Sequence, residues 1–203
     1  MKNILLVFIR NPQLGKVKTR LARTLGDEEA LRIYHILLKK TRATALACKA
    51  ERWLFYSDFI TENDEWLRSD FQKKIQHTGD LGERMDEAFK MAFGAGAEKV
   101  AIIGSDCPDL TGELLQQAFD LLDSTDFVVG PASDGGYYLI GMKALEPSVF
   151  QGIQWSTETV REKTLEKIRV TGKSCALLPM LLDVDTEEDW RRWRWDGTYF
   201  TIS

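Results

Sequence analysis

The chain has 203 residues, of which 44% are hydrophobic and 29% charged. This composition predicts a soluble globular protein and excludes a disordered one. The 27 basic and 31 acidic residues give a net charge of −4, which argues against a general nucleic-acid binder. The charge is uneven, because residues 1–50 contain 11 Lys and Arg against 3 Asp and Glu. A basic start on an acidic protein suggests a local anion site.

The three cysteines, Cys48, Cys107 and Cys175, lie far apart in the sequence, so we predict neither a disulfide framework nor a CxxC metal pair. A reducing cytoplasm is the expected location. The opening residues fit a buried strand better than a signal peptide, and no run approaches the roughly 20 apolar residues of a membrane helix. Because His35 and His77 are the only histidines, a catalytic triad or a multi-histidine zinc site would depend on them.

Apolar runs and helical stripes alternate along the chain and predict the α/β class. Strands are expected at 4–9, 53–56, 74–77, 100–103, 127–129, 137–140 and 176–178. Helices are expected at 31–45, 62–71, 85–93, 111–122, 157–168 and 186–195. Without repeats or a linker, residues 1–203 are expected to form one domain. In a mainly parallel sheet of this kind, ligands bind at the loops that follow the carboxyl ends of the strands.

The loop after the first strand contains Lys16, Lys18 and Arg20 and no acidic residue. Cations beside a helix N-terminus oppose the helix dipole unless an anion lies among them, so this loop suggests a phosphate or diphosphate site. The loop is not a P-loop, because Arg10 and Val17 stand where that motif requires Gly and Ser or Thr. The alternative is a solvated basic loop.

Asp106 and Asp109 follow the central strand at 100–103. Hard carboxylate oxygens suit Mg²⁺ or Mn²⁺, which bind through one or two carboxylates together with substrate phosphates. Such an ion would neutralise a diphosphate from the side opposite the basic loop. We therefore favour a functional role for Asp106, and for Asp109 a turn or cap before the next helix.

Two later segments combine aspartates with turn or helix signals. Asp134 precedes Gly135 and Gly136, a pair that lets the backbone approach a ligand closely but that is also typical of a hairpin turn. Asp183 and Asp185 could both face a cation, or the segment could simply begin the last helix.

Three other features receive structural interpretations. The acidic residues around Asp80 fit the first turn of a helix, where the dipole favours them. Ser156 or Thr157 is expected to cap the helix that follows. Trp190 and Trp193 share one helical face and are expected to pack in a core or at a subunit contact.

Six segments, taken in this order, resemble the glycosyltransferase-like family once called domain of unknown function 2064, within the GT-A or nucleotide-diphospho-sugar transferase superfamily. They are GKVKTRLA (15–22), GDLGERM (79–85), GSDCPDL (104–110), GPASDGGYYLIG (130–141), WST (155–157) and DVDTEEDW (183–190). The resemblance implies a Rossmann-like, GT-A type three-layer sandwich with a mixed, mainly parallel sheet. It also implies binding of a nucleotide diphosphate with a divalent metal.

The resemblance assigns roles to individual positions. Asp106 would be the principal metal ligand, and Asp185, ahead of Asp183, the second. Asp134 would face the sugar or acceptor and act as a catalytic residue beside Asp106. The expected nucleotide- and phosphate-binding positions are Gly15, Lys16, Lys18, Arg20, Gly135 and Gly136.

The expected function is a metal-dependent transferase with a nucleotide-activated donor, foremost a nucleotide-sugar glycosyltransferase, with Mg²⁺ or Mn²⁺ as cofactor. Nucleotidyl transfer from a nucleoside triphosphate, with release of pyrophosphate, would use the same parts. An alternative of another class is a non-catalytic module that binds nucleotide sugars. The expected partners are a nucleotide sugar or nucleoside triphosphate and an unidentified acceptor, without nucleic acid; a homo-oligomer stays open.

Overall fold

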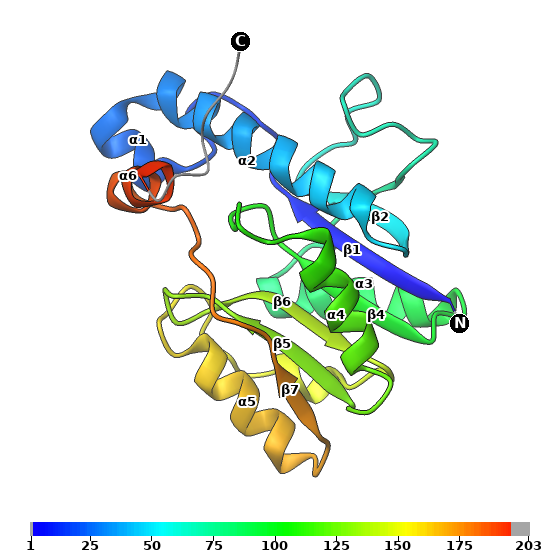
Figure 1. Cartoon of the computed structure of the whole chain (residues 1–203). Helices are drawn as coiled ribbons and strands as arrows, with labels where there is room; N and C mark the ends of the chain where they lie inside the picture. Colours follow the sequence, from blue (N-terminus) through cyan, green and yellow to red (C-terminus); the bar gives the residue numbers. More distant parts are fainter. Residues whose placement is uncertain (1, 196–203) are drawn as a thin grey trace.

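A computed structural model describes residues 2–195 (Figure 1). Seven strands form one sheet in the order β3-β2-β1-β4-β6-β5-β7. The strands are β1 (Asn3–Ile9), β2 (Glu51–Tyr56), β3 (Gln72–Ile75), β4 (Lys99–Ile103), β5 (Phe127–Pro131), β6 (Tyr137–Met142) and β7 (Cys175–Leu177). Strand β6 runs antiparallel to both of its neighbours, and the other neighbouring pairs are parallel.

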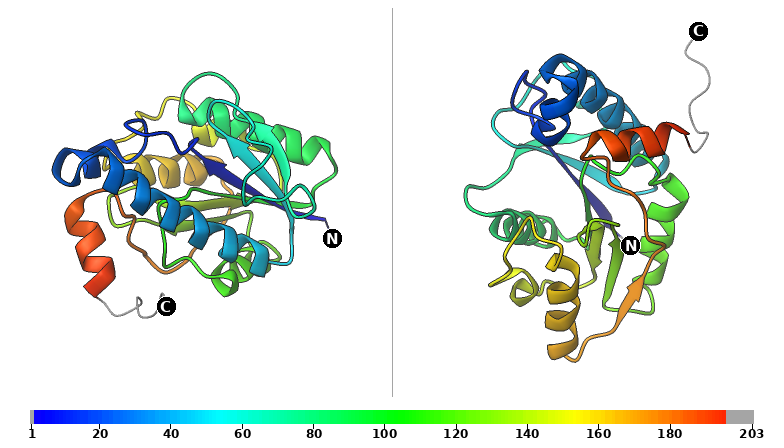
Figure 2. Two further views of the ribbon diagram at one scale, coloured as in Figure 1. Left: turned by 90° about the horizontal axis from the view of Figure 1, so that it is seen from above. Right: turned by 90° about the vertical axis from the view of Figure 1, so that its left-hand side faces the viewer.

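Helices cover both faces of this sheet (Figures 1 and 2). They are α1 (Thr19–Leu25), α2 (Asp27–Ala47), α3 (Leu81–Gly94), α4 (Gly112–Leu121), the 3₁₀ helix η1 (Pro147–Phe150), α5 (Val160–Val170) and α6 (Glu187–Trp195). Helices α2 and α4 pack on one face, and α3 and α5 pack on the other. The predicted three-layer sandwich with a mixed, mainly parallel sheet is thus confirmed. None of the helices described is both long and apolar enough to cross a membrane.

The central strand β1 shows why the first apolar run is continuous. Leu5 and Val7 belong to the core under α2 and α4, whereas Ile4 and Leu6 belong to the core under α3. Alternate side chains of a strand point to opposite faces, so a strand covered on both sides needs apolar residues at every position. The fold therefore buries β1 from Ile4 to Ile9, and its carboxyl end leads into a loop that begins at the exposed Arg10.

The helix predicted at 62–71 is wrong, because this segment is a loop. The Asp64 carboxylate accepts a hydrogen bond from the backbone N–H of Trp66 (3.0 Å) and another from the Tyr56 hydroxyl (2.6 Å). The same carboxylate pairs with the buried ammonium of Lys73 at 2.8 Å. Side-chain bonds of this kind hold the backbone in a non-helical turn, and they override the local helical spacing.

The start of α5 also differs from the prediction. The helix begins at Val160 rather than at Thr157, and its N-cap, Thr159, makes no side-chain cap bond. Ser156 has a φ of 62°, in the left-handed region, and the Thr157 hydroxyl donates to the carbonyl of Gln154. Neither predicted residue therefore caps the helix, because the turn before α5 occupies both of them.

Two other helix starts follow the side-chain patterns of the sequence. Asp80 and Glu83 form a reciprocal capping box at the start of α3. The Thr111 hydroxyl accepts a hydrogen bond from the backbone N–H of Leu114 and so caps α4, as predicted. These caps fix the loops that lead from β3 and β4 into the next helices.

Candidate functional site

The loops after β1 and β4 and the segment before α6 meet at one edge of the sheet. Strands β1 and β4 are parallel neighbours, so their carboxyl ends lie side by side. The backbone N–H of Val184 donates to the carbonyl of Asp106 at 2.8 Å, and Leu181 is similarly paired with Pro131 at the end of β5. The segment 181–185 thus runs across the ends of β5 and β4. It brings the predicted metal ligands Asp106 and Asp185 together.

A single lysine side chain joins these two carboxylates. The Nζ of Lys18 lies 2.6 Å from Oδ1 of Asp106 and 2.9 Å from Oδ1 of Asp185, and it also donates to the carbonyl of Val184 at 2.7 Å. Only 5% of the Lys18 side chain is exposed. Lys18 is the N-cap of α1 and has a left-handed backbone with a φ of 48°, which is uncommon for a residue with a side chain. The sequence placed Lys18 at a phosphate, and the structure pairs it with the two acids.

The charges of Lys18 and Asp185 stabilise each other. Burial alone would lower the pKa of Lys18, but the adjacent carboxylates of Asp106 and Asp185 outweigh burial and raise it above its usual value. The pKa of Asp185 is raised by burial and lowered by Lys18, and the net effect is a lowered pKa. Lys18 and Asp185 therefore favour each other's charged forms.

Asp183 adds an unsatisfied acid to the same place. Its Oδ1 is buried and has no hydrogen-bond partner among the residues described. Burial, and then the negative charges of Asp106 and Asp134, raise the pKa of Asp183 well above its ordinary value. Asp183 thus interacts unfavourably with the acids beside it, and a bound cation would relieve that repulsion.

The donor set can be tested against the expected Mg²⁺ or Mn²⁺. Within residues 2–195, no group of three or more His, Cys, Asp or Glu side chains gathers in a way that could hold a metal by itself. Asp106 and Asp185 do present oxygens to a common point. Mg²⁺ and similar hard ions commonly use one or two carboxylates and take their other ligands from substrate phosphates and water. The residues therefore fit an ion that is bound jointly by protein and substrate.

The other basic residues of this segment, Arg10, Lys16 and Arg20, are exposed. Lys16 is exposed, and Gly15 adopts a φ of 71° at the turn beside it. Arg20 is 63% exposed, and its guanidinium lies 3.8 Å from the second oxygen of Asp185. The side chains of Lys16 and Arg20 are therefore accessible to an anion, and their phosphate-binding role stays a prediction.

The Asp134-Gly135-Gly136 segment forms the turn between β5 and β6. Oδ1 of Asp134 accepts a hydrogen bond from the N–H of Gly136 at 2.8 Å, which confirms the hairpin interpretation. Gly135 has a φ of 91°, and a Cβ at this position would lie 2.1 Å from the carbonyl oxygen of Glu158. Packing against Glu158 thus explains why glycine stands here, and the ligand roles of these three residues stay predictions.

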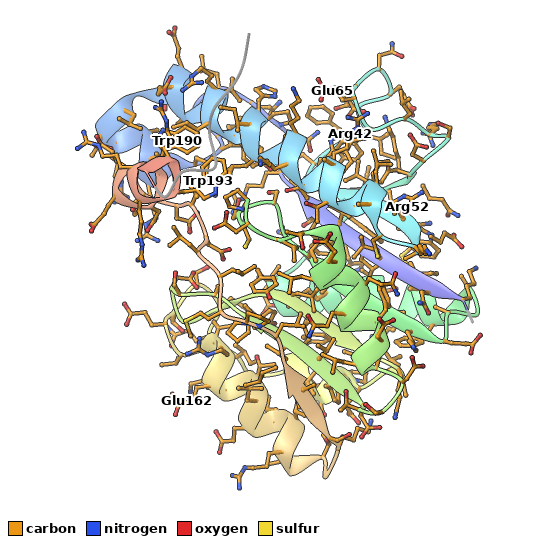
Figure 3. The ribbon with its side chains drawn as sticks, in the orientation of Figure 1. Arg42, Arg52, Glu65, Glu162, Trp190 and Trp193 are labelled. Atoms are coloured by element: carbon orange, nitrogen blue, oxygen red, sulfur yellow. The ribbon has the colours of Figure 1, made fainter. Side chains whose placement is uncertain are left out.

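Asp109 has a partner that the local sequence does not reveal. Thr111, not Asp109, caps α4, and Oδ1 of Asp109 accepts a hydrogen bond from the indole of Trp193 at 2.7 Å. Trp193 and Trp190 are buried against α1 and α2, which confirms their predicted role in a core (Figure 3). The bond joins the β4 loop to α6, and no spacing rule could have found it because the two residues are 84 positions apart.

Thr186 and Asp189 form the start of α6, directly after Asp185. The hydroxyl of Thr186 accepts from the N–H of Asp189, while the Asp189 carboxylate accepts from the N–H of Thr186. This reciprocal pair begins α6, as the sequence suggested. It leaves Asp183 and Asp185, on the other side of Thr186, for the site.

Comparison with known proteins finds a matching family profile and similar solved structures. A family profile described as "Uncharacterized protein conserved in bacteria (DUF2064)" matches residues 40–157, more than half of the chain. A crystal structure from Desulfovibrio desulfuricans G20, provisionally named a nucleotide-diphospho-sugar transferase, is 34% identical with a TM-score of 0.89. The similarity covers 98% of this chain and 89% of that one. Among curated proteins, none matches the chain.

More distant solved structures share the fold. A cytidylyltransferase from Leptospira borgpetersenii is 14% identical, with a TM-score of 0.58 over 100% of this chain and 89% of its own. Rv0371c of Mycobacterium tuberculosis H37Rv, solved in complex with manganese, is 14% identical, with a TM-score of 0.56 over 95% of this chain and 97% of its own. At such identities the likeness extends to the fold alone.

Proposed function

The chain belongs to the DUF2064 family, and on this premise we propose that it is a metal-dependent transferase that uses a nucleotide-activated donor, foremost a nucleotide sugar. One observation carries the proposal. Asp106 and Asp185 converge at the carboxyl ends of the strands, beside a basic loop whose Lys16 and Arg20 face solvent. Acids that can hold a cation next to cations that can hold a diphosphate are the combination that a nucleotide-diphosphate donor requires.

Each residue has a distinct task in this proposal. Asp106 and Asp185 hold the divalent ion, which when bound supplies electrostatic stabilisation of the negative charge on the leaving diphosphate. Lys16 and Arg20 bind phosphate oxygens at the mouth of the site and orient the donor. Asp134, exposed at the β5–β6 turn, orients the acceptor or takes its proton.

Nucleotidyl transfer is the second candidate, because the cytidylyltransferase from Leptospira has the same fold over the whole chain. In that reaction a nucleoside triphosphate reacts with a phosphorylated acceptor, and pyrophosphate leaves. The two reactions differ in their products, so chromatography of the reaction mixture separates them. Free nucleoside diphosphate indicates glycosyl transfer, and pyrophosphate indicates nucleotidyl transfer.

The first experiment identifies the donor. A thermal-shift screen of nucleotides and nucleotide sugars, with and without Mg²⁺ or Mn²⁺, should show stabilisation by one base in a metal-dependent manner. Stabilisation without turnover of any donor would favour the non-catalytic binding module.

We place the protein in the cytoplasm, where its three free thiols would stay reduced.

The second experiment tests the metal ligand. Asp106→Asn keeps the shape of the side chain and removes its charge, so it should lower kcat/KM at least about a hundredfold while the protein stays folded. Asp120→Asn is the matched control and should keep full activity, because this residue is exposed on α4 and its carboxylate accepts a hydrogen bond from nearby Gln116. A D106N enzyme with normal turnover would refute the assignment of Asp106.

A further inference from the structure

The two carboxylates that would hold the metal ion hold an ammonium group in this structure. Oδ1 of Asp106 and Oδ1 of Asp185 both contact the Nζ of Lys18, at 2.6 and 2.9 Å. The third contact of that Nζ is the carbonyl of Val184. An ammonium group has three hydrogens, and here each has an oxygen to approach. Lys18 therefore already fills the position on which both acids converge.

A lysine and a divalent ion cannot share this position. A metal ion needs lone pairs from its ligands at short range, and both Oδ1 atoms direct theirs toward Lys18. Two cations held at one point would also repel each other, with partial screening by solvent because the Asp106 and Asp185 side chains are 44% and 34% exposed. The side chain of Lys18 has to leave before Asp106 and Asp185 can take up an ion through these oxygens.

The displaced lysine needs a new anion. A buried ammonium group without a partner is strongly unfavourable, so movement away from both acids is opposed unless a negative group receives it. Lys18 lies between Lys16, in the same loop, and Arg20, in the first turn of α1, and both of these residues are exposed. A phosphate held by that loop would be within the same cluster of charges and could accept the ammonium group.

We infer that Lys18 exchanges Asp106 and Asp185 for a substrate phosphate when the divalent ion binds, so that ion and diphosphate bind in a mutually dependent way. This inference rests on the proposed function and goes beyond it, because it gives Lys18 two successive partners. Without substrate, Lys18 acts as a built-in counterion that keeps the acids together. With substrate, the same charge serves the leaving diphosphate.

The first test measures Mn²⁺ alone. Lys18→Met removes the competing cation, so Mn²⁺ binding followed by electron paramagnetic resonance should tighten at least about tenfold relative to wild type. A K18M protein that binds Mn²⁺ no more tightly than wild type would overturn the exchange.

A matched control separates this effect from loss of a buried ion pair in general. Lys73, in β3, has a side chain that is 1% exposed and pairs at 2.8 Å with Asp64, in the loop between β2 and β3. Lys73→Met should cost stability as K18M does, yet leave Mn²⁺ affinity at the wild-type value. A tighter Mn²⁺ site in K73M would contradict the inference.

The second test needs only the wild-type protein and so holds even where K18M fails to fold. Amine labelling followed by mass spectrometry should leave Lys18 unmodified in metal-free protein and modify it at saturating Mn²⁺. Inorganic pyrophosphate added with Mn²⁺ should protect it again, while Lys73 stays protected throughout. Protection of Lys18 at saturating Mn²⁺ would overturn the proposed exchange and leave the proposed function untouched. Failure of the wild type and of every variant to bind Mn²⁺ would overturn both the exchange and the metal-dependent function.

Discussion

Replacement of Gly135 by alanine tests the packing behind the β5–β6 turn. Gly135 has a φ of 91°, and an added Cβ would lie 2.1 Å from the carbonyl oxygen and 2.6 Å from the carbonyl carbon of Glu158. The left-handed backbone costs an alanine about 1–2 kcal/mol. The clash with backbone adds about 1–3 kcal/mol, because neither side can rotate away. We therefore expect Gly135→Ala to lower the free energy of unfolding by about 2–5 kcal/mol.

The neighbouring glycine provides the control. Gly136 lies outside the positive-φ region, and a Cβ there would meet Oδ1 of Asp134 at 3.1 Å, a contact that a small shift relieves. Gly136→Ala should therefore cost less than about 1.5 kcal/mol. Urea unfolding, monitored by tryptophan fluorescence and circular dichroism, measures both variants. The packing argument would be refuted if G135A unfolded within about 0.5 kcal/mol of wild type.

Three further predictions concern side chains. Trp193→Phe should lower the free energy of unfolding in urea by about 2 kcal/mol, because Asp109 loses its indole donor; an unchanged midpoint would contradict this bond. Asp183→Asn should raise the free energy of unfolding by at least about 1 kcal/mol at pH 7 without metal, because the raised pKa of Asp183 means that its charged form disfavours folding. This gain should vanish below about pH 4, where the acid is protonated in the unfolded chain as well. A D183N protein that is less stable than wild type at pH 7 would contradict the prediction. The Ser174 hydroxyl donates a hydrogen bond to Asp126 and is the main cause that lowers the pKa of that acid to about 2. Ser174→Ala should therefore destabilise the protein above about pH 4, and the difference from wild type should fade as the pH falls toward 2. A difference in thermal midpoints that does not depend on pH would contradict this prediction.

The strands were predictable where their environment is uniform. A strand such as β1, covered on both faces, leaves a continuous apolar run that can be identified without any knowledge of its neighbours. The segment 62–71 was not predictable, because its conformation depends on a contact outside itself. Asp64 is held by Lys73, whose ammonium is buried only once β3 has joined the sheet. Helical spacing within the segment carries no information about that contact.

The sequence could predict which residues gather at the candidate site, but not which of them contact one another. Carboxyl ends of parallel strands meet at one edge, so the sequence could bring Asp106 and the basic loop together. It could not show that the buried cation of that loop is Lys18, while Lys16 stays outside. Which lysine turns inward depends on the left-handed backbone at position 18 and on acids supplied by the far end of the chain.

The 167 positions between Lys18 and Asp185 also set an order of events during biosynthesis. Strands β1 to β6 and most of their helices are complete by residue 170, before the segment with Val184 and Asp185 has been made. A contact of such long range forms only after the chain between its ends has been ordered or closed into a loop. The nascent protein should therefore acquire its sheet first and its charge cluster last. A chain interrupted shortly after β7 would keep most of the sandwich and would lack Val184 and Asp185, two of the three groups that contact the Lys18 ammonium.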